Sequence, residues 1–336
     1  MISIAVVGAG SMGRNHARVL QAMPGVRLSG LVEPNESIGR EVARLHGGTL
    51  YPTLSALLDA EVPTAAIVAV PTQEHFATAR ALIERGVHVL VEKPIAATEE
   101  EGVALTKLAE ARDVVLAVGH VERFNPAVVA LKAHLHKGAL GRVFQIRAQR
   151  IGPFPARIRD VGVALDLATH DIDVMRWLLG SEVVRVYAEA KREVHTSNED
   201  LVSALLRFAD TSTSEGVVGT LEVNWLTPTK CRELTVTGER GMFRVDYLTQ
   251  DLSFFENASA PFSGWPAMSV LRGVSEGTMT RYQVPKKEPL RAELEAFVAA
   301  IEGDRSGIVP GADGVVALRV ARALTESSRS KQAVVP

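Results

Sequence analysis

A glycine-rich segment close to the N-terminus has the residue types needed to hold a phosphate group. Gly8–Gly13 reads Gly-Ala-Gly-Ser-Met-Gly and directly follows an apolar run at Ile2–Val7. The first two glycines allow a tight turn that brings backbone amides close to a pyrophosphate, and the third lets a helix pack against the strand. The N-terminus of that helix adds positive potential. The pattern predicts a dinucleotide site that uses Gly8, Gly10, Ser11, Met12 and Gly13.

One acidic residue indicates which dinucleotide is bound. Glu33 follows the apolar run Arg27–Val32 and lies 20 residues after Gly13. An acid at this place accepts hydrogen bonds from the ribose hydroxyls of the adenosine. The nearest arginine after it, Arg40, falls inside the next expected helix. We therefore expect NAD rather than NADP as the cofactor.

Two more strand ends carry side chains that suit the reacting end of such a cofactor. One is Val70-Pro71-Thr72, with His75 nearby, and the other is Glu92-Lys93-Pro94. In doubly wound sheets, ligands lie beyond the carboxyl ends of the strands. Taken alone, a loop lysine is more often exposed than catalytic. We nevertheless expect this edge of the cofactor site to include Pro71, Thr72, His75, Glu92 and Lys93.

A second group of candidates lies on a helix expected at about Ala164–Leu179. Asp166, His170 and Asp173 occupy positions i, i+4 and i+7. At about 100° per residue they fall within roughly 60° of one another, on one helix face. A carboxylate one turn from an imidazole fixes its tautomer and raises its basicity, as a general base requires. Without other support, such a pair is more often structural.

The elements that position these residues begin with a strand–helix alternation over residues 1–120. The strands are apolar nearly throughout, as in a parallel sheet buried on both faces. Helix signals separate them: Gly86 as a C-terminal cap, and Thr98 with Glu101 as a capping box. This predicts an α/β domain with a doubly wound parallel sheet of the Rossmann type. Its expected strands are Ile2–Val7, Arg27–Val32, Ala65–Val70, Val87–Val91 and Val114–Val118.

Residues 121–336 are predicted to form a second, α+β domain with a large, mostly antiparallel sheet. Asn125 followed by Pro126 starts a helix at Ala127–His136, and a strand at Val143–Ile151 precedes the Ala164–Leu179 helix. Strand-like runs separated by turns follow, and Glu239-Arg240-Gly241 is a hairpin connection. The runs are Val183–Ala190, Leu201–Phe208, Val217–Trp225, Glu233–Thr237, Met242–Tyr247 and Leu252–Phe255. Helices at Leu290–Glu302 and Asp313–Ser328 close the chain.

The composition limits the class of protein. The 336 residues are 46% hydrophobic and 23% charged, with a net charge of −2, so we expect a globular protein without a nucleic-acid or membrane partner. The single cysteine, Cys231, excludes an internal disulfide. No apolar stretch approaches a membrane span, and the N-terminus lacks the basic region of a signal peptide. The expected location is the cytoplasm. No metal motif is found, and His134 and His136 are expected on a solvated helix face.

Together, Gly8-Ala9-Gly10, Glu92-Lys93-Pro94 and the segment Asp166–Asp173 resemble the glucose–fructose oxidoreductase / inositol dehydrogenase (Gfo/Idh/MocA) family. The resemblance runs from Met1 to the final helix. It implies an NAD-dependent sugar dehydrogenase acting on CH–OH, with Lys93, Asp166 and His170 as the catalytic group. It also implies a homodimer or homotetramer formed through the C-terminal sheet. The family's usual ribose-binding acid is aspartate, and this chain has Glu33 instead.

Within the family, residues 119–126 and the loop at 152–157 are most similar to UDP-N-acetylglucosamine 3-dehydrogenases, which implies a nucleotide-sugar substrate oxidised at C3. An acid-free set of arginines agrees with this, because guanidinium groups suit a pyrophosphate better than a neutral polyol. The set is Arg142, Arg147, Arg150, Arg157 and Arg159. Strand alternation sends Arg147 and Arg150 to opposite faces, which leaves Arg157 and Arg159 as the diphosphate candidates. Solvated or interface arginines are the other interpretation.

The predicted substrate contacts are Lys93, Arg123, Asn125, Arg157, Arg159, Asp166 and His170. His170 is expected to act as the base, with Lys93 polarising the oxygen, but Lys93 as the base fits equally. A free inositol or simple sugar is the alternative substrate. A non-catalytic, NAD(H)-sensing regulator is the alternative from outside enzymes, although both Lys93 and His170 are present.

Overall fold

A computed structural model describes residues 1–155, 161–195, 197–211, 216–258 and 275–336 of the chain. It divides into two compact units. The first comprises residues 1–124 and 288–319, and the second comprises residues 125–287 and 320–336. The predicted domain break at residue 120 lies close to the first of these boundaries. The return of residues 288–319 to the first unit was not anticipated from the sequence.

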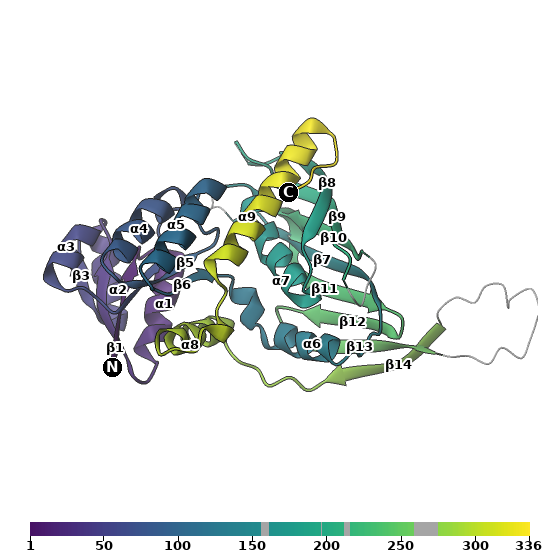
Figure 1. The fold of residues 1–336 in the computed structure, drawn as a ribbon, viewed down its shortest axis with the longest axis horizontal. Coiled ribbons are helices and arrows are strands. Elements are labelled where there is room, and N and C mark those ends of the chain that lie inside the picture. The colour runs from purple at the N-terminus through teal and green to yellow at the C-terminus, as the bar shows by residue number, and fades with distance from the viewer. Residues whose placement is uncertain (156–160, 196, 212–215, 259–274) are drawn as a thin grey trace, which may run out of the picture. The chain divides into compact units, whose positions relative to one another are not determined.

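The first unit contains a parallel sheet of six strands in the order β3-β2-β1-β4-β5-β6 (Figure 1). This is the Rossmann strand order, and it confirms the predicted doubly wound α/β fold. Every residue of the two short strands β4 and β6 is buried, as expected for a sheet covered on both faces. The strands are β1 (Ile2–Val7), β2 (Val26–Val32), β3 (Thr49–Tyr51), β4 (Ala65–Val68), β5 (His88–Glu92) and β6 (Leu116–Gly119).

The helices of the first unit begin and end largely where their capping residues predict. Thr98 and Glu101 form the expected capping box, and Gly86 has a φ of +74° after α4. The helix α8 belongs to this unit because Leu294 and Phe297 are buried in the same apolar core as β1 and α1. The elements are α1 (Ser11–Gln21), α2 (Glu36–His46), α3 (Leu54–Ala60), η1 (Thr72–Glu74), α4 (His75–Glu84), α5 (Glu99–Ala111), η2 (Val121–Phe124), α8 (Pro289–Ile301), η4 (Arg305–Gly307) and the first half of α9 (Gly311–Ser330).

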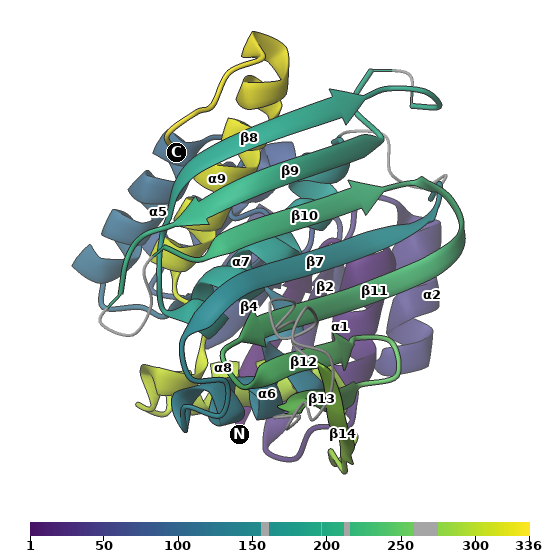
Figure 2. The same ribbon diagram turned by 90° about the vertical axis from the view of Figure 1, so that its right-hand side faces the viewer.

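The second unit is built on an eight-stranded sheet in the order β14-β13-β12-β11-β7-β10-β9-β8 (Figure 2). Its neighbouring strands are antiparallel except for β7 and β10, so the prediction of a mostly antiparallel sheet is confirmed. The expected hairpin connection joins Gly238 to Gly241. The strands are β7 (Val143–Pro153), β8 (Val183–Lys191), β9 (Leu201–Phe208), β10 (Val218–Asn224), β11 (Leu226–Gly238), β12 (Gly241–Asp246), β13 (Asp251–Ala258) and β14 (Ser275–Tyr282).

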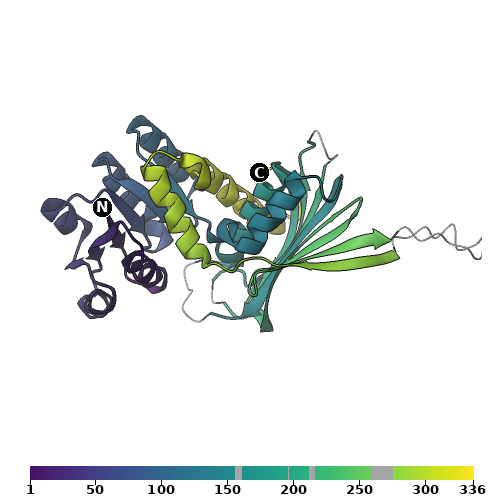
Figure 3. The same cartoon turned by 90° about the horizontal axis from the view of Figure 1, so that it is seen from below.

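Helices cover one face of this sheet and leave the other face open among the described elements (Figures 2 and 3). The helices are α6 (Pro126–His136), the π-helical segment η3 (Ala164–Ala168), α7 (Thr169–Leu179) and the end of α9. Along β7, Ile146 and Ala148 are buried on the helix side, whereas Gln145 and Arg147 are exposed. In neither unit is a described helix both long and apolar enough to cross a membrane.

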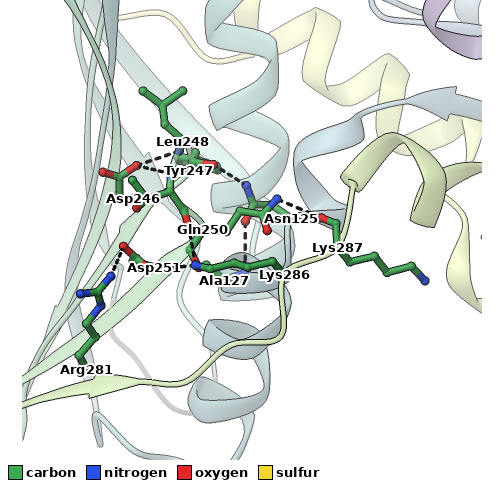
Figure 4. Close-up of polar contacts among 11 residues, drawn as sticks. Asn125, Ala127, Asp246, Tyr247, Leu248, Gln250, Asp251, Arg281, Lys286 and Lys287 are labelled. Carbon is green, nitrogen blue, oxygen red and sulfur yellow. Dashed lines mark hydrogen bonds and ion pairs between the residues drawn. The ribbon is translucent and has the colours of Figure 1, made fainter. Parts of the chain in front are cut away.

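Polar contacts fix the start of the second unit (Figure 4). The Asn125 carboxamide accepts a hydrogen bond from Ala127 N at 3.2 Å, which confirms it as the N-cap of α6. Its Nδ2 donates to the carbonyl oxygen of Tyr247 at 3.1 Å. Nearby, Lys286 and Arg281 both donate to the carboxylate of Asp251 and hold its pKa far below the usual range.

Candidate cofactor site and catalytic helix

The three glycines of the N-terminal loop have different steric surroundings. Gly8 has a φ of +93°, and a Cβ there would lie 2.6 Å from the carbonyl oxygen of Ala69. A Cβ on Gly13 would lie 1.8 Å from the carbonyl oxygen of Gly8, so this glycine allows α1 to pack against the loop. A Cβ on Gly10 would meet no protein atom within 4 Å. The space beside Gly10 is therefore available to a ligand that approaches the backbone closely.

The start of α1 is suited to an anion. Gly10 is its N-cap residue, no side chain caps the first turn, and that turn contains no acidic residue. The free N–H groups at such a helix start attract a phosphate. Next to them, the Glu33 carboxylate accepts hydrogen bonds from Ala9 N and from Asn35 N, each at 2.9 Å. This pairing holds an acid beside the glycine loop, as a ribose-binding residue requires, so the loop and Glu33 fit an NAD molecule.

Lys93 follows β5 and is joined to Pro94 by a cis peptide bond. The preceding residue, Glu92, is buried, and His16 Nε2 on α1 donates to its Oε1 at 2.8 Å. Glu92 Oε2 accepts a hydrogen bond from Lys93 N at 3.3 Å. Burial alone would raise the pKa of Glu92, but the hydrogen bond from His16 and the nearby positive charges bring it below the ordinary value. A buried carboxylate therefore anchors the backbone of the candidate lysine, and His16 was not identified from the sequence.

His75 connects the two predicted strand ends. The residue is 1% exposed, and its ring places Nδ1 2.8 Å from the carbonyl oxygen of Pro94 and Nε2 3.0 Å from that of Val70. Burial lowers the pKa of His75, although the two carbonyl groups oppose this effect. The imidazole thus ties the end of β4 to the loop that carries Lys93. This contact places Val70 and Pro94 at one edge of the sheet, where the sequence predicted them, and gives His75 a structural role as well.

The helix that carries Asp166 and His170 differs from the sequence expectation in one respect. Residues 164–168 form a π-helical turn, and α-helical geometry begins only at Thr169. The prediction that Asp166, His170 and Asp173 fall within about 60° of one another assumed α-helical geometry throughout, so it does not apply across this turn. Asp166 and His170 are half-buried, whereas Asp173 is fully buried and does not share their exposure. π-Helical turns occur frequently at functional sites.

Asp171 is a buried residue of this helix that the sequence did not single out. Its carboxylate accepts hydrogen bonds from Arg150 Nε at 2.7 Å and from Arg150 Nη2 at 3.1 Å. Both side chains are almost completely buried, and the guanidinium lies 5.1 Å from the centre of the Tyr247 ring. This bidentate pair ties α7 to the middle strand β7. Its removal would leave a buried charge without its partner.

The predicted arginine set is dispersed. Arg147 is exposed on the open face of the sheet, Arg150 is buried on the helix side, and Arg142 pairs with Glu239 at the surface. The alternation argument is confirmed for β7. Arg157 and Arg159 lie outside the described residues. In the first unit, Arg123 is buried and forms an ion pair with Asp313 at 2.8 Å.

A cavity of about 200 Å³ lies beside Asp166 within the second unit. Its lining includes Trp225, which directly follows β10, and two cationic side chains, Lys230 and Arg232, from β11. Neither cation was identified from the sequence, because only the packing of β11 beside β7 brings them to Asp166. The cavity therefore joins a candidate catalytic carboxylate to positive charge.

Comparisons with known proteins assign the chain to a family. Residues 2–120 match the description "Oxidoreductase family, NAD-binding Rossmann fold", and residues 128–244 match "GFO/IDH/MocA C-terminal domain". UDP-N-acetylglucosamine 3-dehydrogenase from Acidithiobacillus ferrooxidans is 32% identical over 92% of this chain and 91% of its own length. Myo-inositol dehydrogenase Hyg17 from Streptomyces leeuwenhoekii is 31% identical over 98% of both chains.

Solved structures agree with this assignment. The structure of the Acidithiobacillus ferrooxidans enzyme aligns with a TM-score of 0.84 and 29% identity, covering 98% of each chain. The GenD2 protein of gentamicin A biosynthesis, crystallised with NAD, aligns with a TM-score of 0.81 and 26% identity, covering all of this chain and 96% of its own. The chain therefore belongs to the Gfo/Idh/MocA family, and it is an NAD-dependent dehydrogenase.

Proposed function

We propose that this enzyme is a sugar dehydrogenase that oxidises the C3 hydroxyl of UDP-N-acetylglucosamine to a ketone, with NAD as the hydride acceptor. The observation that carries the proposal is the similarity to UDP-N-acetylglucosamine 3-dehydrogenase, which extends over 92% of the chain at 32% identity. The cationic cavity beside Asp166 supports it, because a nucleotide sugar carries a diphosphate and a free polyol does not.

The proposed chemistry divides the work among three side chains. When bound, NAD accepts a hydride from the carbon that carries the hydroxyl. His170 removes the hydroxyl proton, and Asp166 orients the imidazole and raises its basicity. Lys93 donates a hydrogen bond to the oxygen as negative charge develops on it. The exchange of roles between Lys93 and His170 is the other arrangement compatible with these residue types.

The proposed cofactor contacts follow from the first unit. The open space at Gly10 and the uncapped start of α1 suit the pyrophosphate, with Ser11 and Met12 in the same turn. The paired Glu33 carboxylate suits the ribose hydroxyls. Pro71, Thr72, His75, Glu92 and Lys93 are proposed for the nicotinamide end, and Arg123, Asn125, Arg157 and Arg159 remain proposed substrate contacts.

A free inositol is the second candidate substrate. The similarity to myo-inositol dehydrogenase Hyg17 favours it, because this relative is almost as similar as the nucleotide-sugar enzyme and matches over 98% of the chain. An inositol carries no anionic group, so this reading leaves the cationic lining of the cavity without a substrate partner.

The two substrates are separated by initial-rate measurements of NAD reduction. UDP-N-acetylglucosamine, free N-acetylglucosamine, glucose and myo-inositol are compared at saturating NAD. The proposal expects the highest kcat/KM for UDP-N-acetylglucosamine, because binding energy from the remote nucleotide helps to place C3 for reaction. Equal or better turnover of myo-inositol would replace the proposal with the inositol assignment.

We also propose that two or four copies associate through the open face of the eight-stranded sheet. Tyr187, Leu205 and Val218 are exposed apolar residues of this face, and they lie on the adjacent strands β8, β9 and β10. An apolar patch on a sheet is normally covered by another layer, and no described element of the second unit covers this one. A second copy of the same face would supply that layer.

A further inference from the structure

The cavity beside Asp166 is formed where three strands and the catalytic helix meet. Its walls come from the end of β7, the π-helical turn η3, the end of β10 and the first half of β11. All of these elements belong to the second unit. The charged residues of its lining are Asp166, Arg150, Lys230 and Arg232.

Strand register brings the cationic side chains to this cavity. Arg232 pairs directly with Arg150 across β11 and β7. The next residues of β11 on the same face, Leu234 and Val236, are buried, so Arg232 points to the helix-covered side of the sheet. Lys230 lies in the irregular stretch of β11 between Leu226 and Cys231, where the register shifts, and it lines the same cavity as Arg232. Opposite it, a Cβ on Gly152 would lie 3.6 Å from Lys230 Cγ.

The cationic side chains of this lining are of the types that bind anions. Two like charges directly across a sheet destabilise it, and here Arg150 is already neutralised by its bidentate pairing with Asp171. Among the described residues that line the cavity, Lys230 and Arg232 are further cationic side chains, and Asp166 carries the carboxylate. An ammonium and a guanidinium together suit phosphate oxygens or a carboxylate.

The aromatic wall of the cavity is held rigidly. Trp225 is 4% exposed and contacts Phe154 edge to face, with ring centres 5.5 Å apart. It also stacks on His195 at 6.1 Å. The His195 segment is fixed because Asp200 accepts hydrogen bonds from the backbone N–H groups of residues 193–195. A preorganised wall reduces the ordering that ligand binding requires.

We propose that Lys230 and Arg232 form an anion subsite that binds the charged group of the substrate next to the reacting carbon. The inference rests on the proposed function, under which the anion is the diphosphate of UDP. That diphosphate is bonded to C1 of the sugar, two carbon atoms from C3. An anion site in the same cavity as Asp166 therefore fits a substrate that is charged close to its reacting hydroxyl. The carboxylate of a uronic acid accepts the same kinds of hydrogen bond and is the other possible anionic group of the substrate.

The test compares Lys230→Gln, Arg232→Gln and the double variant with the wild type. Kinetics with UDP-N-acetylglucosamine at saturating NAD give KM and kcat, and calorimetry in the presence of NADH gives the affinities for UDP and for glucuronate. Each single variant should raise KM and weaken UDP binding by about 10- to 100-fold, while kcat changes by less than about fivefold. Arg281→Gln is the matched control, because it removes one positive charge from the same sheet at β14, outside the cavity lining. It should leave both values unchanged.

The outcomes separate this inference from the proposed function. If the wild type oxidises UDP-N-acetylglucosamine and the variants keep its KM and UDP affinity, the subsite is refuted and the function stands. If the wild type does not oxidise that sugar but binds UDP, and the variants lose UDP binding, the subsite stands and the function fails. If the variants lose affinity for glucuronate but keep their affinity for UDP, the anion that binds at this subsite is a carboxylate. Thermal melting of each variant shows whether it is folded. The side chain of Lys230 is exposed, so its replacement should have little effect on stability.

Discussion

Two glycine substitutions in the N-terminal loop should both weaken cofactor binding, but only one of them should destabilise the fold. In Gly10→Ala the new Cβ meets no protein atom within 4 Å, and the backbone at Gly10 (φ −66°, ψ −163°) is accessible to alanine. We expect its stability to change by no more than about 1 kcal/mol, the usual effect of replacing an N-cap glycine. The same methyl group would occupy the space in which the pyrophosphate approaches the backbone.

The loss of NAD affinity can be estimated from the hydrogen bonds at that place. A charge-assisted hydrogen bond to phosphate is worth about 1.5–3 kcal/mol, so losing one weakens NAD binding by about 10- to 100-fold. In Gly13→Ala the Cβ would lie 1.8 Å from the carbonyl oxygen of Gly8, so α1 must move. This overpacking should reduce stability by at least about 1–3 kcal/mol, with NAD binding lost as a consequence.

The assay combines calorimetric titration with NAD and thermal unfolding followed by circular dichroism. Gly10→Ala should weaken NAD binding without a large change in the unfolding temperature. Gly13→Ala should lower the unfolding temperature and also abolish NAD binding. If Gly10→Ala binds NAD as tightly as the wild type, the space beside Gly10 does not hold the cofactor. If Gly13→Ala unfolds at the wild-type temperature, the assigned packing of α1 against the loop is incorrect.

Three further predictions concern the cofactor, the chemistry and the assembly. NAD should bind more tightly than NADP in calorimetric titrations, because the Glu33 carboxylate repels a 2′-phosphate; equal or tighter NADP binding would contradict this. His170→Ala and Lys93→Ala should each lower kcat by about 10²–10⁴ with little change in NAD affinity, and near-normal turnover of both would remove them from the active site. Leu205→Arg should convert the oligomer to monomers in light scattering, because it places a charge on the exposed apolar patch; an unchanged molar mass would exclude that face as the interface.

The sequence was sufficient for those parts of the fold that depend on local patterns. Largely apolar runs predicted five of the six parallel strands, and the capping residues Thr98 and Asn125 lie at the helix starts predicted for them. The sixth strand, β3, has only three residues, too few for any periodicity to appear. The return of α8 to the first unit depends on which core its apolar face enters, and an amphipathic pattern does not specify that.

The site residues that belong to a local sequence motif could be predicted. Those that come together only through tertiary contacts could not. The glycine loop, Glu33 and the ends of β4 and β5 were expected from the sequence. The pair formed by His16 and Glu92 joins residues 76 positions apart, and the pair formed by Arg150 and Asp171 depends on how α7 packs on β7. Similarly, Arg232 reaches the cavity through the register of β11 with β7, and Lys230 through the irregular stretch of β11 that precedes this register.

The central claim is tested most directly by following the hydrogen atom at C3 of the sugar. The enzyme is incubated with NAD and UDP-N-acetylglucosamine that carries deuterium at C3, and the nucleotide products are analysed by mass spectrometry. The account predicts that the reduced cofactor acquires the deuterium, that the sugar nucleotide becomes a 3-ketone, and that His170→Ala suppresses both changes. Reduced cofactor without deuterium would show that another carbon is oxidised, and no reduction of NAD by this substrate would contradict the proposed function.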